Sequence, residues 1–92
     1  MTAPAELVIE VTAQDIANGI PTAACSCPVA LAVHRLLGPG EVTVTADAHG
    51  AWIEADGSTW VLLDPGHRFI ELFDDGLPVQ PGTFTATLVS AL

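Results

Sequence analysis

Two cysteines and three histidines are the residues of this sequence whose side chains most often bind metals or react. Cys25 and Cys27 are separated by one residue, and His34 lies seven positions after Cys27. A structural zinc site usually takes its four ligands from two closely spaced pairs, and the sequence has no second pair. On a helix, Cys27 and His34 would also lie roughly 10 Å apart along the axis. We therefore expect no metal site, and we expect both cysteines to pack as small apolar side chains under a loop.

Cys27 has a second interpretation, as a nucleophile. It precedes Pro28, which suits the first position of a helix because its missing N–H would have no partner there. A helix N-terminus lowers the pKa of a thiol, so Cys27 with a histidine base would make a small hydrolase. The spacing selects none of the histidines as that base. We favour a capping role for Cys27, and we predict no catalytic residue and no cofactor.

The two arginines are the residues best suited to hold an anion. Arg35 and Arg68 both lie on predicted helices whose N-termini offer free backbone N–H groups. A phosphate-bearing molecule held by Arg35 or Arg68 is therefore one hypothesis. Asp64 is expected to cap the helix that carries Arg68, which would weaken the site there. In the alternative interpretation, both arginines are solvated and paired with nearby acids.

Trp52 is the aromatic candidate for ligand contact. If no helix covers its side of the sheet, a large apolar ring lies exposed beside Val61, and such patches mark subunit or ligand interfaces. A tryptophan can also stack on a nucleobase. A second layer of helices covering Trp52 is the alternative. The complete set of predicted ligand-binding residues is Cys27, His34, Arg35, Trp52, His67 and Arg68.

Hydrophobic periodicity and turn residues predict the elements that position these side chains. Strands are expected at 7–11, 41–46, 51–55, 58–63 and 83–90, and helices at 13–18, 28–37 and 66–74. The order β-α-α-β-β-β-α-β predicts an α+β fold, with an antiparallel or mixed sheet of about five strands and helices packed on one face.

Local signals predict how some of these elements begin, end and pack. Asp56-Gly57 is a two-residue hairpin turn. It places Ile53 opposite Trp60 on the core side and Trp52 opposite Val61 on the other. Thr12 and Asp15 have the spacing of a capping box. The stripe that the second helix should bury is Val29, Ala32, Val33, Leu36 and Leu37.

Composition limits the classes of partner. The chain has 92 residues, of which 50% are hydrophobic and 14% charged, which predicts a single folded domain over 1–92. A core this small is often stabilised by self-association, so we expect a homo-oligomer. A net charge of −9 with two arginines and no lysine argues against binding to nucleic acids or anionic membranes. The scattered acids indicate a solubilising surface, with imitation of DNA or binding of a basic partner as the alternative.

No signal peptide is visible, which predicts a cytoplasmic protein with reduced thiols.

Three stretches of the sequence carry a resemblance: "IEVTAQDIANGI", "CSCPVALAVHRLL" and "HRFIELFDDGLPVQPGTFTATL". Together they resemble a family of small phage and prophage proteins of unknown function, over most of the chain except 50–62. In this sequence His34 stands where the family often has a second basic residue. The resemblance implies a phage accessory protein in the host cytoplasm. Small phage proteins are often inhibitors of host defence, and some sequester nucleotide signals inside symmetric oligomers.

We therefore expect a non-enzymatic phage-type accessory protein that sequesters a small nucleotide-like ligand, a host-defence signal, as a homo-oligomer. Arg35 and Arg68 would hold phosphate, and Trp52 or His67 would contact a base or ribose. One alternative is a protein-interaction module that inhibits a host factor through its acidic face or the Trp52 surface. The other is the small hydrolase that uses Cys27.

Overall fold

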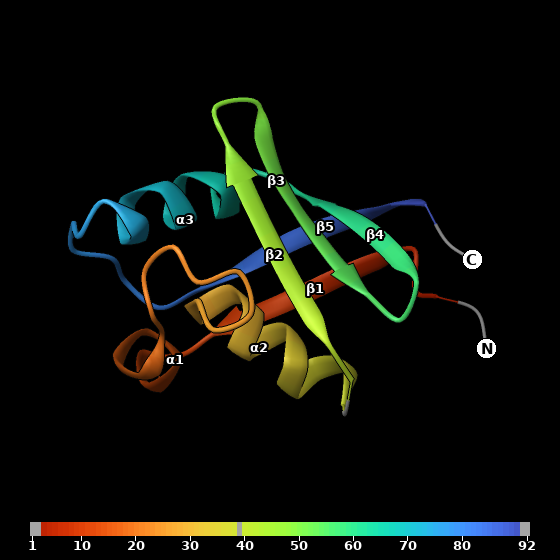
Figure 1. Ribbon diagram of the computed structural model, residues 1–92, viewed down its shortest axis with the longest axis horizontal. Helices are drawn as coiled ribbons and strands as arrows, with labels where there is room; N and C mark the ends of the chain where they lie inside the picture. The colour runs from red at the N-terminus through yellow and green to blue at the C-terminus, as the bar shows by residue number, and fades with distance from the viewer. Residues whose placement is uncertain (1–2, 39, 91–92) are drawn as a thin grey trace.

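The structure is a computed structural model that describes residues 3–38 and 40–90. It has the predicted element order and an α+β fold with an antiparallel sheet of five strands, in the order β1-β5-β4-β3-β2 (Figure 1). This confirms the predicted fold class and shows that the sheet is antiparallel rather than mixed. The elements are β1 (Glu6–Val11), α1 (Ala13–Asn18), α2 (Pro28–Leu37), β2 (Val42–Asp47), β3 (Gly50–Ala55), β4 (Ser58–Leu62), α3 (Gly66–Asp74) and β5 (Gly82–Ser90).

The sheet is strongly coiled, so that its two edges approach the same helix. β1 and β2 are the edge strands, and α2 contacts both of them. Figure 1 shows β2 crossing the direction of β1, with α2 beside both strands. Twist accumulates in one direction across an antiparallel sheet, which brings distant edges together when the strands are strongly twisted. The helices therefore pack on the concave face, and the predicted packing on one face is confirmed. Within residues 3–38 and 40–90, no helix covers the convex face.

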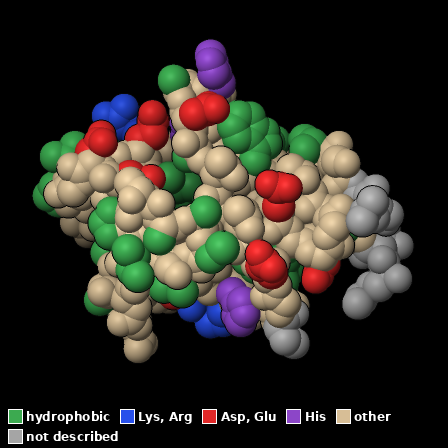
Figure 2. All heavy atoms as spheres, in the orientation of Figure 1, with side chains coloured by type: hydrophobic (Ala, Val, Ile, Leu, Met, Phe, Trp, Pro, Cys, Tyr) green, Lys and Arg blue, Asp and Glu red, His purple; other side chains and the backbone are tan. Residues whose placement is uncertain are grey.

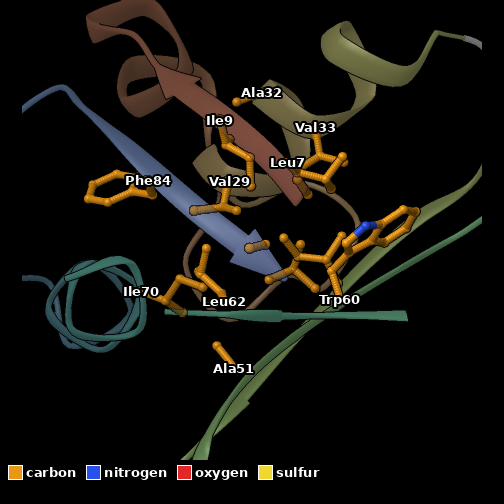
Figure 3. Close-up of a cluster of buried hydrophobic side chains, with 14 of the residues drawn as sticks. Leu7, Ile9, Val29, Ala32, Val33, Ala51, Trp60, Leu62, Ile70 and Phe84 are labelled. Atoms are coloured by element: carbon orange, nitrogen blue, oxygen red, sulfur yellow. The ribbon is translucent and has the colours of Figure 1, made fainter. Parts of the chain in front are cut away.

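The core lies between α2, α3 and the concave face of the sheet. Figure 3 shows side chains from β1, α2, β4 and β5 meeting there. The predicted hairpin register is confirmed, with Ile53 opposite Trp60 and Trp52 opposite Val61. Trp60 is 2% exposed, and its indole N–H donates to the Pro4 carbonyl oxygen at 2.8 Å. The largest side chain of the core is thereby buried with its polar atom satisfied.

Helix ends follow the predictions at α1 and α2 but not at α3. The capping box at α1 is present, because the Thr12 hydroxyl accepts from the Asp15 N–H and the Asp15 carboxylate accepts from the Thr12 N–H. Cys27 caps α2 as predicted, its sulfur accepting from the Ala30 N–H at 3.4 Å. The predicted Asp64 cap of α3 is wrong. Pro65 occupies the cap position and has no side-chain acceptor, so no described side chain satisfies this helix end.

The buried stripe of α2 is shorter than predicted. Val29 and Val33 are fully buried, and Ala32 is also in the core. Leu36 is 50% exposed, so its predicted burial is wrong, and Leu37 is only partly buried against the core. All buried residues of α2 lie between Pro28 and Val33, which means that the last turn extends past the core. No helix within the described ranges has the length and apolarity that a membrane crossing requires.

Candidate functional site

Arg35 is held in a structural ion pair. Its guanidinium donates two hydrogen bonds of 2.8 Å to the two carboxylate oxygens of Asp15 and a third, of 2.9 Å, to the Glu10 carbonyl oxygen. Asp15 is buried at 5% exposure, whereas the Arg35 side chain is 53% exposed. This bidentate geometry is the strongest form of the pair. Arg35 therefore joins α2 to α1 and to β1, which corresponds to the paired alternative raised from the sequence.

The electrostatics of Asp15 follow from this arrangement. The hydrogen bonds from Arg35 are the largest influence and hold the pKa of the Asp15 carboxyl at about 2, below its ordinary value of 3.8. Burial opposes this change by favouring the neutral acid, and the Thr12 backbone N–H adds to it by donating to the carboxylate. Asp15 is therefore ionised throughout the neutral range, and its charge is neutralised by Arg35.

Cys27 lacks the properties of a nucleophile. It is 5% exposed, and burial raises the pKa of its thiol, which outweighs the opposite effect of the helix N-terminus. Cys25, in contrast, is exposed, so the prediction that both cysteines pack inside is wrong for Cys25. The loop that carries Cys25 lies against the edge strand β2, where its sulfur is 4.0 Å from the Thr43 hydroxyl.

His34 shares a hollow with Cys25 rather than with Cys27. This hollow has a volume of about 290 Å³, and its lining includes Glu41 and Leu31. Among the described residues, no group of three or more His, Cys, Asp or Glu side chains is arranged to hold a metal ion. From the spacing alone, His34, His49 and His67 were equally good partners for a cysteine. Only the path of the loop over β2 shows which cysteine lies beside His34.

His67 and Arg68 are neighbours in sequence but face different parts of the structure. The His67 Nε2 atom lies 2.7 Å from the Asp47 carbonyl oxygen and 3.7 Å from a Glu71 carboxylate oxygen. His67 therefore connects α3 to the β2–β3 turn. Arg68 lines a groove on the other side of α3, and His67 is not part of its lining.

The groove beside Arg68 is a shallow, open hollow with a mostly apolar surface. It has a volume of about 420 Å³ and runs between α3 and the segment 78–84. Its lining is mostly apolar side chains, with the Arg68 guanidinium as the charged group: Pro65, Phe69, Leu72, Pro78, Val79, Pro81 and Phe84. The rings of Phe69 and Phe84 are 5.0 Å apart and tilted by 49°, which fixes the wall where α3 meets β5. Ligand sites are commonly apolar hollows of about 300–1,000 Å³ with a few polar groups, so this groove has the expected size and character.

Two further features favour an anion near Arg68. Arg68 makes no ion pair with any residue in the described ranges. It also lies in the first turn of α3, which has no side-chain cap, although the Gly66 N–H donates to the Leu63 carbonyl oxygen. The partial positive charge of a helix N-terminus adds to the charge of the guanidinium.

The sequence missed this groove because Phe84 and the segment 78–82 are far from Arg68 along the chain. Pro78 and Pro81 were the only local signal of a stiff wall.

Trp52 lies outside this groove, on the convex face of the sheet. No described helix covers Trp52, yet its side chain is half-buried. The reason is that its ring lies along β3 over Gly50. A Cβ atom placed on Gly50 would be 3.5 Å from the Cη2 and Cζ2 atoms of the ring. Figure 2 shows the positive charges as two separate patches, one over α3 and one near α2. The structure therefore does not bring Arg35, Arg68 and Trp52 into one site.

Comparisons with known proteins give no family for the chain: no protein-family model matches it, and no curated protein or solved structure is significantly similar to it. The resemblance to small phage proteins and the function that it implies stay predictions.

Proposed function

We propose that this protein is a non-enzymatic binding protein whose ligand site is the Arg68 groove, the hollow between α3 and residues 78–84. Its ligand has a flat apolar part and one anionic group, a class that includes mononucleotides. The observation that carries the proposal is the position of Arg68 at the edge of an aromatic-lined groove of about 420 Å³. The flat part would lie against the exposed Pro78 and Pro81 rings and Leu72, because Phe69 and Phe84 are only 6% and 7% exposed and form the floor of the groove. The guanidinium would bind the phosphate or carboxylate.

The site differs from the one expected from the sequence. Arg35, whose guanidinium is engaged by Asp15, is left out of the ligand set, and so is His67, which contacts the β2–β3 turn. Cys27 is the cap of α2. Arg68 stays, and the apolar contacts come from the groove rather than from Trp52. One guanidinium and an uncapped helix end suit a single phosphate better than a polyphosphate.

The biological role that we propose follows from the resemblance to phage accessory proteins. A phage protein of this kind would sequester a host-defence nucleotide by stoichiometric binding, and it would act as a homo-oligomer in the host cytoplasm. Native mass spectrometry of gently purified protein tests this role directly. An oligomer that carries a discrete mass of nucleotide size is the expected result, and a bare monomer would contradict sequestration by an oligomer.

Titration with AMP and with adenosine, followed by NMR and calorimetry, tests the ligand site. AMP should bind more tightly than adenosine and should shift the amide signals of α3 and residues 78–84. Arg68→Gln should weaken AMP binding by about tenfold or more, because a charged hydrogen bond to phosphate contributes roughly 1.5–3 kcal/mol. Adenosine binding should not change, since adenosine lacks the anionic group.

Arg35→Gln is the matched control, because it removes the same charge from a residue outside the groove. It should leave AMP affinity unchanged when measured well below its unfolding temperature. Equal losses in both variants would mean that AMP responds to net charge alone, and the groove would then not be the site. An unchanged AMP affinity in Arg68→Gln would also refute the proposal.

A further inference from the structure

The convex face of the sheet presents a set of side chains that the ligand groove does not use. Alternation along the strands directs one side chain in two into the core and the others outward. Threonine is the most frequent residue at the outward positions, which is ordinary for the water-facing side of an antiparallel sheet. Four large apolar side chains on β3, on β4 and the residue after it, and on the edge strand β1 depart from this pattern: Val8, Trp52, Val61 and Leu63, which we call the outer patch.

Strand register places the outer patch on adjacent rows of the sheet, with Thr85 between Leu63 and Val8. Trp52 pairs with Val61 on the neighbouring strand. Leu63 follows two positions after Val61, and its N–H donates to the Thr85 carbonyl oxygen. Thr85 is in turn the partner of Val8 on β1. Val8 is 57% exposed and Leu63 is 44% exposed, so a monomer leaves these apolar side chains in water. Trp52 and Val61 are partly exposed, and apolar side chains gathered on one face in this way mark interaction sites.

The charges around the outer patch have one sign. The outward positions of the five strands include Glu6, Glu10, Asp47 and Glu54, and they include no lysine or arginine. Glu54 lies two residues from Trp52 on the same face, and Glu6 lies in the same row as Val61, across Thr87. Arg35 lies beside Glu10 on the edge strand β1 and also pairs with the buried Asp15. It does not neutralise Glu6, Asp47 or Glu54 by an ion pair. Figure 2 shows how widely the acidic side chains spread over the surface in that view.

We propose that the outer patch is a docking surface for a protein partner with an apolar centre and a basic rim. The apolar side chains of such a partner would cover Trp52 and Val61, and its lysines or arginines would face Glu54 and Glu6. A second copy of this chain fits the patch poorly, because a symmetric contact would place carboxylates opposite carboxylates within a molecule of net charge −9. This surface is distinct from the Arg68 groove and does not depend on its ligand.

A synthetic amphipathic peptide of leucines and lysines is the probe that tests this surface. Its binding to the full chain is followed by NMR, with amide shifts expected on β3, β4 and the residues around Leu63. Trp52→Thr, which retains a strand-forming residue, should weaken binding by about tenfold or more, because a buried tryptophan often dominates an interface. Glu54→Gln should weaken it by roughly two- to fivefold, and by less at high salt.

Two controls separate recognition from general attraction to an acidic protein. Asp75→Asn removes an exposed carboxylate at the end of α3 and should leave the affinity unchanged. A peptide with glutamates in place of the lysines should not bind. The proposal is overturned if the shifts centre on α2 or α3, or if Trp52→Thr binds as well as the original chain with an unchanged unfolding temperature. Concentration-dependent self-association that Trp52→Thr abolishes would assign the surface to a second copy and would also overturn it.

Discussion

Replacement of Asp15 by asparagine should make the stability of this protein much less dependent on acidic pH. Asparagine has nearly the same shape, and its side-chain oxygen can still accept from the Thr12 N–H. The change therefore removes mainly the charged pair with Arg35, whose two hydrogen bonds are each 2.8 Å long. Arg35 is more than half exposed, so water solvates its charge in the variant and no isolated charge is left buried.

The size of the effect follows from the pKa. The carboxyl of Asp15 titrates at about 2 in the folded protein, against an ordinary value of 3.8. At about 1.4 kcal/mol per pKa unit, the difference corresponds to an upper limit of roughly 2.5 kcal/mol. Exposure of Arg35 allows solvent to screen the pair, so we expect a loss of about 1–2 kcal/mol at pH 7. Because the folded pKa is the lower one, this contribution is complete above pH 3.8 and decreases as the pH falls toward 2.

Urea unfolding of both proteins at pH 7, 4 and 2.5 measures this difference. Other carboxyl groups also titrate in this range, and comparison of the two proteins at each pH cancels their contribution. The gap in unfolding free energy should be similar at pH 7 and 4 and clearly smaller at pH 2.5. Asp75→Asn, on an exposed carboxylate, should change stability by less than about 0.5 kcal/mol at pH 7.

Two results would refute this reasoning about Asp15. A gap of the same size at pH 2.5 as at pH 7 would mean that shape, rather than charge, explains the cost of the substitution. The second result is additivity: if the unfolding free energy lost in the double variant equals the sum of the losses in Asp15→Asn and Arg35→Gln, the two side chains do not interact energetically.

Two further predictions concern the packing and reactivity of the segment between α1 and α2. Gly19→Ala should destabilise the protein by about 1–3 kcal/mol, because its new Cβ atom would lie 2.6 Å from the Pro28 ring. Thermal unfolding measures this loss of stability, and an unchanged unfolding temperature would contradict the close contact. A thiol reagent at pH 8 should modify exposed Cys25 in the native protein, whereas buried Cys27, which caps α2 at the Ala30 N–H, should react only on unfolding. Mass spectrometry of labelled peptides shows the order, and rapid native labelling of Cys27 would restore the nucleophile interpretation.

Much of the fold was predictable because its signals are short-range. The bounds of the three helices agree with the prediction, and those of the strands differ by at most one residue at each end. Asp56-Gly57 fixed the hairpin register, since a two-residue turn leaves the flanking strands one way to pair. The capping box at Thr12 and the cap at Cys27 depend on neighbouring backbone groups in the same segment. Local geometry alone determines such features.

The candidate site was far less predictable, because it depends on how the sheet coils. The sequence placed Arg35 and Arg68 on helices, but it did not show that Arg35 would meet Asp15, twenty residues earlier in the chain. Nor did it show that Arg68 would line an open groove bounded on one side by residues 78–84.

Coiling also determined which surfaces are covered. It brings both sheet edges to α2 and leaves the convex face, which carries Trp52, without a helix over it in the described part of the chain. Leu36 has the periodicity of a buried residue but projects from the last turn of α2 beyond the core. Periodicity determines which side of a strand or helix is apolar. Only the tertiary structure decides what that side meets, because the contacts join residues far apart in the chain.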